Sequence, residues 1–325
     1  MLPVLRQRSA YRRLLTLRPQ ITSRTKLSSP SLPIRRPVFC PISGTRAIYT
    51  GPRKQEPRMS NEPKVDLAKF LNPSVPKRVY DFWFQHVEHD QNLTLPTQEV
   101  FKPWFTKDAG FDLECATQFK PILAAIHQAR PELQTQEQVE AQAQQILELV
   151  SPGSALDWLG LIVLLDQLPR NCYRGEEAAL VFSFFDTIAR VITLRALEKK
   201  IEYSPEVRYR LALRHWFYLP LMHSENLSHQ EIMLEKYREM DEDIRRLLDE
   251  QPAEGLGEQE LADREILVGN RKAVEAISAL NLNFQKEHYD IIARFGRYPY
   301  RNKVLRRTTT PEEEKFLQEA DISFG

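Results

Sequence analysis

The sequence predicts an all-α fold, and three observations lead to that prediction. Glycine is scarce, at 11 of 325 residues, which argues against glycine-rich phosphate loops and turn-dense β-sandwiches. From Lys64 onward, apolar residues recur at helical spacing, and runs that alternate in the manner of a strand are rare. The segments between the helical patterns are short. We therefore expect helix to follow helix through a single domain, residues 64–325.

The first predicted helices lie between residues 79 and 126. The first apolar stripe consists of Val79, Phe82, Trp83 and His86. A second stripe occupies residues 111–126 and contains Pro121, which is expected to kink or divide that helix.

The most apolar helix is expected in the middle of the chain. Residues 134–149 are rich in Gln and Glu, which predicts a solvated helix or a family-specific insertion. Ser154 can cap the next helix, whose interior, residues 156–168, is apolar nearly all round. A helix of that kind belongs at the centre of the core.

Toward the C-terminus the same periodicity predicts helices over residues 176–200, 205–217, 229–250 and 270–295. A polar segment with two glycines, residues 251–264, is expected to be an exposed loop. Thr310, Pro311 and Glu313 supply a cap, a proline at the first helical position and an acid three residues after the cap. Together they predict a closing helix.

The first 63 residues differ from the rest. Residues 1–55 hold 12 Lys and Arg and no Asp or Glu, and residues 2–17 interleave leucine with arginine. That composition is typical of a mitochondrial presequence. The alternative is a disordered basic tail that carries no targeting signal. We predict a disordered leader that directs import into the mitochondrial matrix. Translation from Met59 would give a cytosolic form.

The remaining residues predict an acidic body. After residue 55 the chain carries 33 basic and 44 acidic residues, which argues against nucleic-acid binding. The longest uncharged apolar runs, such as residues 158–165, are too short for a membrane span, and we expect a soluble protein. Three cysteines, Cys40, Cys115 and Cys172, do not form a disulfide framework.

Three polar segments interrupt the apolar pattern, and burial of their charges costs free energy unless each finds a partner. In the first, residues 164–175, Asp166 and Arg170 lie one helical turn apart at the end of the most hydrophobic helix. Arg174 follows in the exit loop. A ligand site and a buried structural ion pair both fit this pattern.

The second segment, residues 217–227, contains His223, Ser224 and Glu225 in succession. Adjacent residues do not converge as a catalytic triad. We therefore expect either His223 or Glu225 to face the interior as a functional group. The alternative is that His223 is a structural core histidine whose hydrogen bonds are satisfied.

The third segment, residues 288–302, ends the last long helix in an aromatic turn. Its polar residues are His288, Arg294, Arg297, Arg301 and Asn302. Guanidinium groups in one turn offer bidentate sites for carboxylate or phosphate, which makes this segment the best candidate for an anion-binding surface. Interaction of the arginines with the helix dipole is the alternative.

At these segments the chain resembles a bacterial and eukaryotic family known as domain of unknown function 924, from about Val79 to Phe324. The residues that carry the resemblance are Asp81–Phe84, Trp104–Phe105, Asp108, Phe111–Asp112, Leu164–Gln167, Pro169–Asn171, Arg174–Gly175, Phe217–Leu221, His223–Glu225, His288, Arg294–Arg297, Pro299 and Arg301–Asn302. The family looks all-helical and tetratricopeptide-like, so the resemblance implies stacked antiparallel helices in a superhelical array. It brings no settled activity.

The chain departs from the family pattern at three positions. Met222 stands where the family usually has Glu, Tyr300 where it usually has His, and Arg306 where a small residue is usual. If those family positions form an acid/base pair or metal ligands, this chain lacks part of the set.

Three functions of different classes follow from these segments. The preferred function is binding of a small anionic ligand or peptide in a polar cavity lined by Asp166, Arg170, Arg174, His223, Glu225, His288, Arg294, Arg297, Arg301 and Asn302. The second is a metal-assisted or acid/base hydrolytic enzyme, whose catalytic candidates are His223, Glu225 and His288. No local metal-ligand spacing occurs, and no metal or cofactor is assigned. The third is a protein-interaction scaffold without a small-molecule site.

Overall fold

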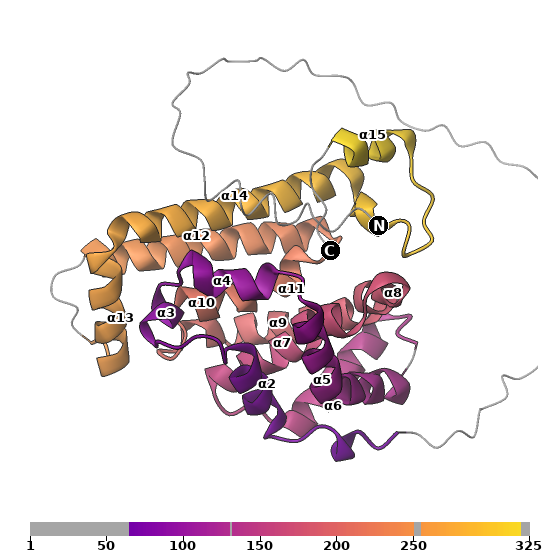
Figure 1. Ribbon diagram of the computed structural model, residues 1–325, viewed down its shortest axis with the longest axis horizontal. Coiled ribbons are helices and arrows are strands. Elements are labelled where there is room, and N and C mark those ends of the chain that lie inside the picture. The colour runs from indigo at the N-terminus through magenta and orange to yellow at the C-terminus, as the bar shows by residue number, and fades with distance from the viewer. Residues whose placement is uncertain (1–64, 131, 250–254, 320–325) are drawn as a thin grey trace, which may run out of the picture. The chain divides into compact units, whose positions relative to one another are not determined.

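The computed structural model describes residues 65–130, 132–249 and 255–319, and every regular element among them is a helix (Figure 1). The all-α prediction is confirmed, and the tetratricopeptide-like superhelical array stays a prediction. The predicted leader, residues 1–63, lies outside the described residues. In the described part of the chain, no helix is both long and apolar enough to cross a lipid bilayer.

The α-helices follow one another in the order α2 (Val75–Trp83), α3 (Gln91–Thr94), α4 (Gln98–Phe105), α5 (Ala109–Ala129), α6 (Gln136–Val150), α7 (Ala155–Cys172), α8 (Ala178–Leu180), α9 (Asp186–Glu198), α10 (Leu211–Arg214), α11 (Leu219–Met222), α12 (Leu227–Asp249), α13 (Glu258–Gly269), α14 (Arg271–Phe295) and α15 (Pro311–Glu319). Short 3-10 turns lie at Leu67–Lys69, Gly175–Glu177, Ile201–Tyr203, His215–Phe217 and Pro299–Arg301. One π-helical turn, Val181–Phe185, leads into α9.

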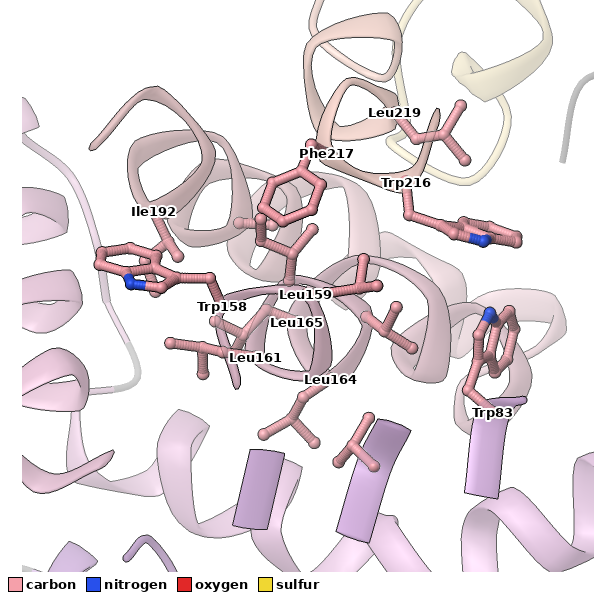
Figure 2. Close-up of a cluster of buried hydrophobic side chains, with 14 of the residues drawn as sticks. Trp83, Trp158, Leu159, Leu161, Leu164, Leu165, Ile192, Trp216, Phe217 and Leu219 are labelled. Carbon is pink, nitrogen blue, oxygen red and sulfur yellow. The ribbon is translucent and has the colours of Figure 1, made fainter. Parts of the chain in front are cut away.

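Helix α7 is the centre of the fold, because α2, α5 and α9 all pack on it. Its start is the predicted cap: the Ser154 hydroxyl accepts the Asp157 amide at 3.1 Å, and the Asp157 carboxylate accepts the Ser154 amide at 3.0 Å. Residues 159–165 are buried without interruption. Figure 2 shows Leu159, Leu161, Leu164 and Leu165 pointing away from the helix axis in different directions. The prediction of a core helix here is confirmed.

The contact between α2 and α7 is unusually close at Gly160. A Cβ atom added there would lie 2.1 Å from the carbonyl oxygen of Pro76 and 2.8 Å from its carbonyl carbon. Because these are backbone atoms, they cannot rotate away as a side chain would. Glycine is therefore required for the two helices to approach this closely.

We expect Gly160→Ala to lower the free energy of unfolding by about 1–3 kcal/mol, because the added methyl group would force the two helices apart. Urea denaturation measures the change. Gly269→Ala is the matched control, since a Cβ there meets no atom within 4 Å and that variant should unfold like the wild type. Equal stability of all three proteins would contradict the steric argument.

Helices α12 and α14 form a long antiparallel pair (Figure 1). Near one end, the Arg271 guanidinium donates to the Asp249 carboxylate at 2.8 Å. Farther along, the Gln285 side-chain amide donates to the Gln230 side-chain oxygen at 2.8 Å. Both glutamines are fully buried, so the pair is joined by polar contacts inside its apolar face.

Several boundaries differ from those predicted. The helix predicted over residues 176–200 is divided into a 3-10 turn, a short α turn, the π turn and α9. The loop predicted over residues 251–264 ends earlier than expected, because α13 begins at Glu258. The Glu260 carboxylate accepts the Gly257 amide at 3.1 Å there, which starts the helix.

Helix α5 is continuous through Pro121, so of the two expectations a division of the helix there is wrong. Pro121 removes one backbone hydrogen bond. The residues around it, Phe119, Ile122 and Leu123, are buried against the core, and this burial outweighs the lost bond.

Cys115 on this helix and Cys172 on α7 are buried free thiols, which agrees with the predicted absence of a disulfide framework among the described residues.

Candidate functional site

Four separate segments bring charged side chains together beside the C-terminal half of α7. We call this group the polar cluster: Asp166, Arg170, Asp186, His223 and Arg301. The first two residues come from α7, and Asp186 is the first residue of α9. His223 directly follows α11, and Arg301 ends the turn after α14. The sequence separation between them explains why no local motif revealed the set.

Asp166 and His223 form the shortest link between these segments. His223 Nδ1 lies 2.7 Å from Asp166 Oδ1, and the Gln167 side-chain amide donates to Asp166 Oδ2 at 2.6 Å. Burial would raise the pKa of Asp166, but the charge of Arg170 and the hydrogen bonds from His223 and Gln167 outweigh burial and lower it. Asp166 is therefore an ionised carboxylate inside the protein, 1% exposed.

His223 is a neutral imidazole with a defined tautomer. Burial and the nearby Arg170 hold its pKa below the usual value, although Asp166 opposes them. An ionised carboxylate only accepts hydrogen bonds, so Nδ1 of His223 must carry the proton that it donates to Asp166. The lone pair is then on Nε2, and the His223 side chain is 18% exposed.

Asp186 is shared by two arginines. Its carboxylate lies 2.8 Å from Arg170 Nη1 and 3.6 Å from Arg301 Nη1. The π-helical turn ends immediately before Asp186, and such turns are frequent at functional sites. Arg301 also stacks on aromatic rings, with its guanidinium carbon 4.5 Å from the Phe182 ring centre and 4.7 Å from that of Tyr298.

Two nitrogen atoms of these arginines have no hydrogen-bond partner among the described residues. They are Nη2 of Arg170 and Nε of Arg301, and both are buried. Nη1 of each arginine is bonded: Arg170 Nη1 donates to the Asp166 carbonyl, and Arg301 Nη1 donates to the His223 carbonyl at 3.0 Å. Both carboxylate oxygens of Asp186 also lack a hydrogen bond of good geometry, so unmatched donors and acceptors lie together in the polar cluster.

The His223 segment is held in place by Gln230 of α12. The Gln230 side-chain amide donates to the carbonyls of Met222 at 2.9 Å and Ser224 at 2.6 Å. The Tyr298 hydroxyl donates to the same Met222 carbonyl. Met222, one of the departures from the family pattern, thus contributes its backbone here, while its side chain packs in the core.

Glu225 lies beside the polar cluster, and its negative charge is balanced by other partners. Its carboxylate accepts the Tyr298 amide at 3.0 Å and pairs with Arg307 at 2.8 Å. Arg301 lies 4.0 Å away. Of the departures from the family pattern, Tyr300 lies next to Arg301, with its ring centre 5.7 Å from the guanidinium carbon.

His288 is buried and packs against Tyr298. Its Nδ1 is 2.8 Å from the Phe284 carbonyl, and its ring packs edge-on against Tyr298 at 5.9 Å. Burial lowers the pKa of His288 to about 3. A neutral histidine in this position supports the aromatic wall of the cluster rather than supplying a charge to it.

We expect the protein to lose stability as the pH falls below 6.5, with His288 contributing to the loss. Its folded pKa is depressed, so between about pH 3 and 6.5 the unfolded chain binds more protons than the folded one. One such histidine changes the free energy of unfolding by up to about 1.4 kcal/mol per pH unit. His288→Gln should flatten the dependence measured by denaturation at several pH values. An unchanged slope would contradict this account.

The structure places Arg174 and Asn171 away from the polar cluster. Arg174 donates to both carboxylate oxygens of Asp112 on α5, at 3.0 and 2.6 Å. Asn171 donates to the same carboxylate at 2.8 Å. These contacts tie the end of α7 to the start of α5.

Three further predicted residues contact α15. Arg297 pairs with both oxygens of Glu313, at 2.6 and 2.8 Å, and Asn302 donates to Glu313 at 3.2 Å. Arg294 pairs with Glu312 at 2.9 Å. Of the arginines predicted around the end of the last long helix, the structure brings Arg301 into the cluster.

Asp186 was missed in the sequence, although it interrupts the apolar run that ends at Phe185. With Asp166 and His223 it offers three ligand atoms within 4.8 Å of one another, which are types that bind divalent cations. Arg170 Nη1 lies 2.8 Å from Asp186 and 3.6 Å from Asp166, so a guanidinium already supplies positive charge there. The three side chains as arranged fit this internal cation, and we assign no metal to them.

The fold and the site define an all-helical protein with a buried Asp–Arg–His cluster. The family described as "Bacterial protein of unknown function (DUF924)" matches residues 79–321, and the chain belongs to this family. The predicted resemblance is confirmed. The chain is also similar to a solved protein of unknown function from Agrobacterium tumefaciens, with 27% identity and a TM-score of 0.47, over 76% of this chain and 98% of that one. No curated protein matches the chain.

Proposed function

We propose that the chain binds a small anionic ligand at the polar cluster. The observation that carries this proposal is the pair of buried guanidinium nitrogens, on Arg170 and Arg301, without an acceptor. A buried charged donor that lacks a partner costs free energy, and native proteins rarely leave one. A carboxylate or phosphate would supply oxygen acceptors to both arginines and form charge-assisted hydrogen bonds.

The exposure of the cluster indicates the side from which a ligand would enter. The side chains of Arg170 and His223 are 19% and 18% exposed, whereas those of Asp186 and Arg301 are 4% exposed. Solvent therefore reaches the cluster along Arg170 and His223. Asp186 and Arg301 form its base.

His223 couples the proposed binding to pH. It is neutral without a ligand, because burial and Arg170 lower its pKa. An anion beside it would favour the protonated imidazole and raise that pKa. Binding should therefore take up a proton and become tighter at mildly acidic pH than at mildly alkaline pH.

The test is a thermal-shift and calorimetric titration with phosphate, sulfate and short mono- and dicarboxylates. We expect at least one of them to raise the Tm of the wild type and Arg170→Lys to lose the effect, because lysine cannot offer the same fork of donors. Arg294→Gln is the matched control, since Arg294 is exposed and pairs with Glu312 outside the cluster. A wild type that responds to no anion, or an Arg170→Lys variant that responds fully, would contradict the proposal.

A second candidate function, acid/base catalysis, is favoured by the Asp166–His223 pair. A buried carboxylate that fixes the imidazole tautomer, with Nε2 left as a base, is an arrangement used for general base catalysis. The scaffold function has no comparable support in this cluster.

Hydrolysis of ester and phosphoester reporter substrates tests this second candidate. We expect turnover by the wild type and its loss in His223→Gln, with Asp166→Asn also impaired because the tautomer is no longer held. Circular dichroism must show that both variants are folded. Absence of turnover in the wild type, or full turnover in folded His223→Gln, rejects the catalytic function.

A further inference from the structure

A cavity of about 410 Å³ lies between α6, α9 and the start of α12. Its polar lining consists of Gln136, Arg190, Ser224, Glu225, Asn226 and His229. Only Glu225 among these was considered as a site residue from the sequence. A volume in this range suits a small molecule.

Arg190 is the cation of this cavity, and the carboxylate that acts on its charge is Asp186, one turn earlier on α9. Arg190 makes no hydrogen bond or ion pair with any side chain in the part of the chain that the structure describes, although it is half-buried. Arg195, five residues later on α9, pairs with Glu140 at 2.8 Å and with Gln144 at 2.6 Å. Burial lowers the pKa of Arg190, and Asp186 one turn earlier only partly opposes this.

The one carboxylate in the lining does not oppose a bound anion at full strength. Glu225 is paired with Arg307 at 2.8 Å and lies 4.0 Å from Arg301. It also accepts the Tyr298 amide at 3.0 Å. Its negative charge is thereby compensated by these partners, and the cavity keeps the positive charge of Arg190.

His229 adds a hydrogen-bond donor. The Ser224 hydroxyl accepts the Asn226 amide at 3.2 Å, so its own proton is available to His229 Nδ1, 2.8 Å away. Nδ1 is then the acceptor, and Nε2 carries the ring proton. Burial and the charge of Arg190 lower the pKa of His229 to about 4, so the ring is neutral.

Two helix starts border the same cavity. Gln136 is the first residue of α6, a helix of 15 residues, and Asn226 immediately precedes α12, a helix of 23 residues. The amides of a first helical turn and the positive end of the helix dipole favour an anion. Here they accompany an arginine that forms no hydrogen bond or ion pair with another side chain of the described residues.

We propose that this cavity binds the phosphate group of a small phosphate monoester. Arg190 would hold two phosphate oxygens through its guanidinium fork, and His229 Nε2 would donate to a third. A phosphate has more acceptor oxygens than a carboxylate, which suits a site with donors on several sides. The remaining volume would hold the rest of the ester. This site is separate from the polar cluster and does not depend on the function proposed for it.

The proposal is tested on the full chain by calorimetric titration with glycerol phosphate, inorganic phosphate and, as a probe without phosphate, glycerol. We expect saturable binding of glycerol phosphate, weaker binding of inorganic phosphate and none of glycerol. Arg190→Gln should weaken the binding at least about tenfold, since it removes a charge-assisted pair. Arg195→Gln, from the same helix, should bind as the wild type does.

Two further measurements separate this site from a structural role and from the polar cluster. Arg190→Gln should be about as stable as the wild type without ligand, because Arg190 forms no hydrogen bond or ion pair with a side chain of the described residues. Arg170→Lys should keep its response to glycerol phosphate. Phosphate should also raise the pKa of His229 measured by NMR. Binding that is unchanged in Arg190→Gln, absent in the wild type, or limited to inorganic phosphate would overturn the proposal.

Discussion

The burial of α7 on every side is the constraint on which the rest of the structure depends. At Gly160 the backbone of α2 comes too close for any side chain, and the leucines that follow are enclosed by α2, α5 and α9. A helix in this position carries its last turns into the interior as well. Asp166 is therefore buried with the apolar residues before it, and its charge must be met by groups from other segments.

That requirement organises the second half of the chain. The imidazole of His223 meets Asp166, and Gln230 fixes the backbone on both sides of His223 from α12. Gln230 is in turn bonded to Gln285 of α14. The antiparallel pair α12 and α14 thus positions one imidazole against one carboxylate. A change in the packing of this pair would be transmitted to the site through hydrogen bonds, since each buried donor and acceptor has few alternatives.

The helices could largely be predicted from the sequence, because apolar periodicity and caps such as Ser154 act locally. The polar cluster could be predicted only in part. Arginines near the last long helix have acidic partners on α15, and nothing in their spacing distinguishes Arg297, which pairs with Glu313, from Arg301, which turns inward. Asp186 was missed because a π turn precedes it, and the turn changes which side of the helix faces α7.

Glu225 explains how the polar cluster and the cavity around Arg190 can lie close together. Arg170 and Arg301 are gathered around Asp186, while Arg190 faces the neighbouring cavity one turn farther along α9. Without compensation, Glu225 at the border would attract Arg190 and fill the cavity with an internal ion pair. Because Arg307 holds the Glu225 carboxylate at 2.8 Å, the positive charge of Arg190 stays available. The residues after α14 therefore contribute to both sites, to one through Arg301 and to the other by keeping Glu225 occupied.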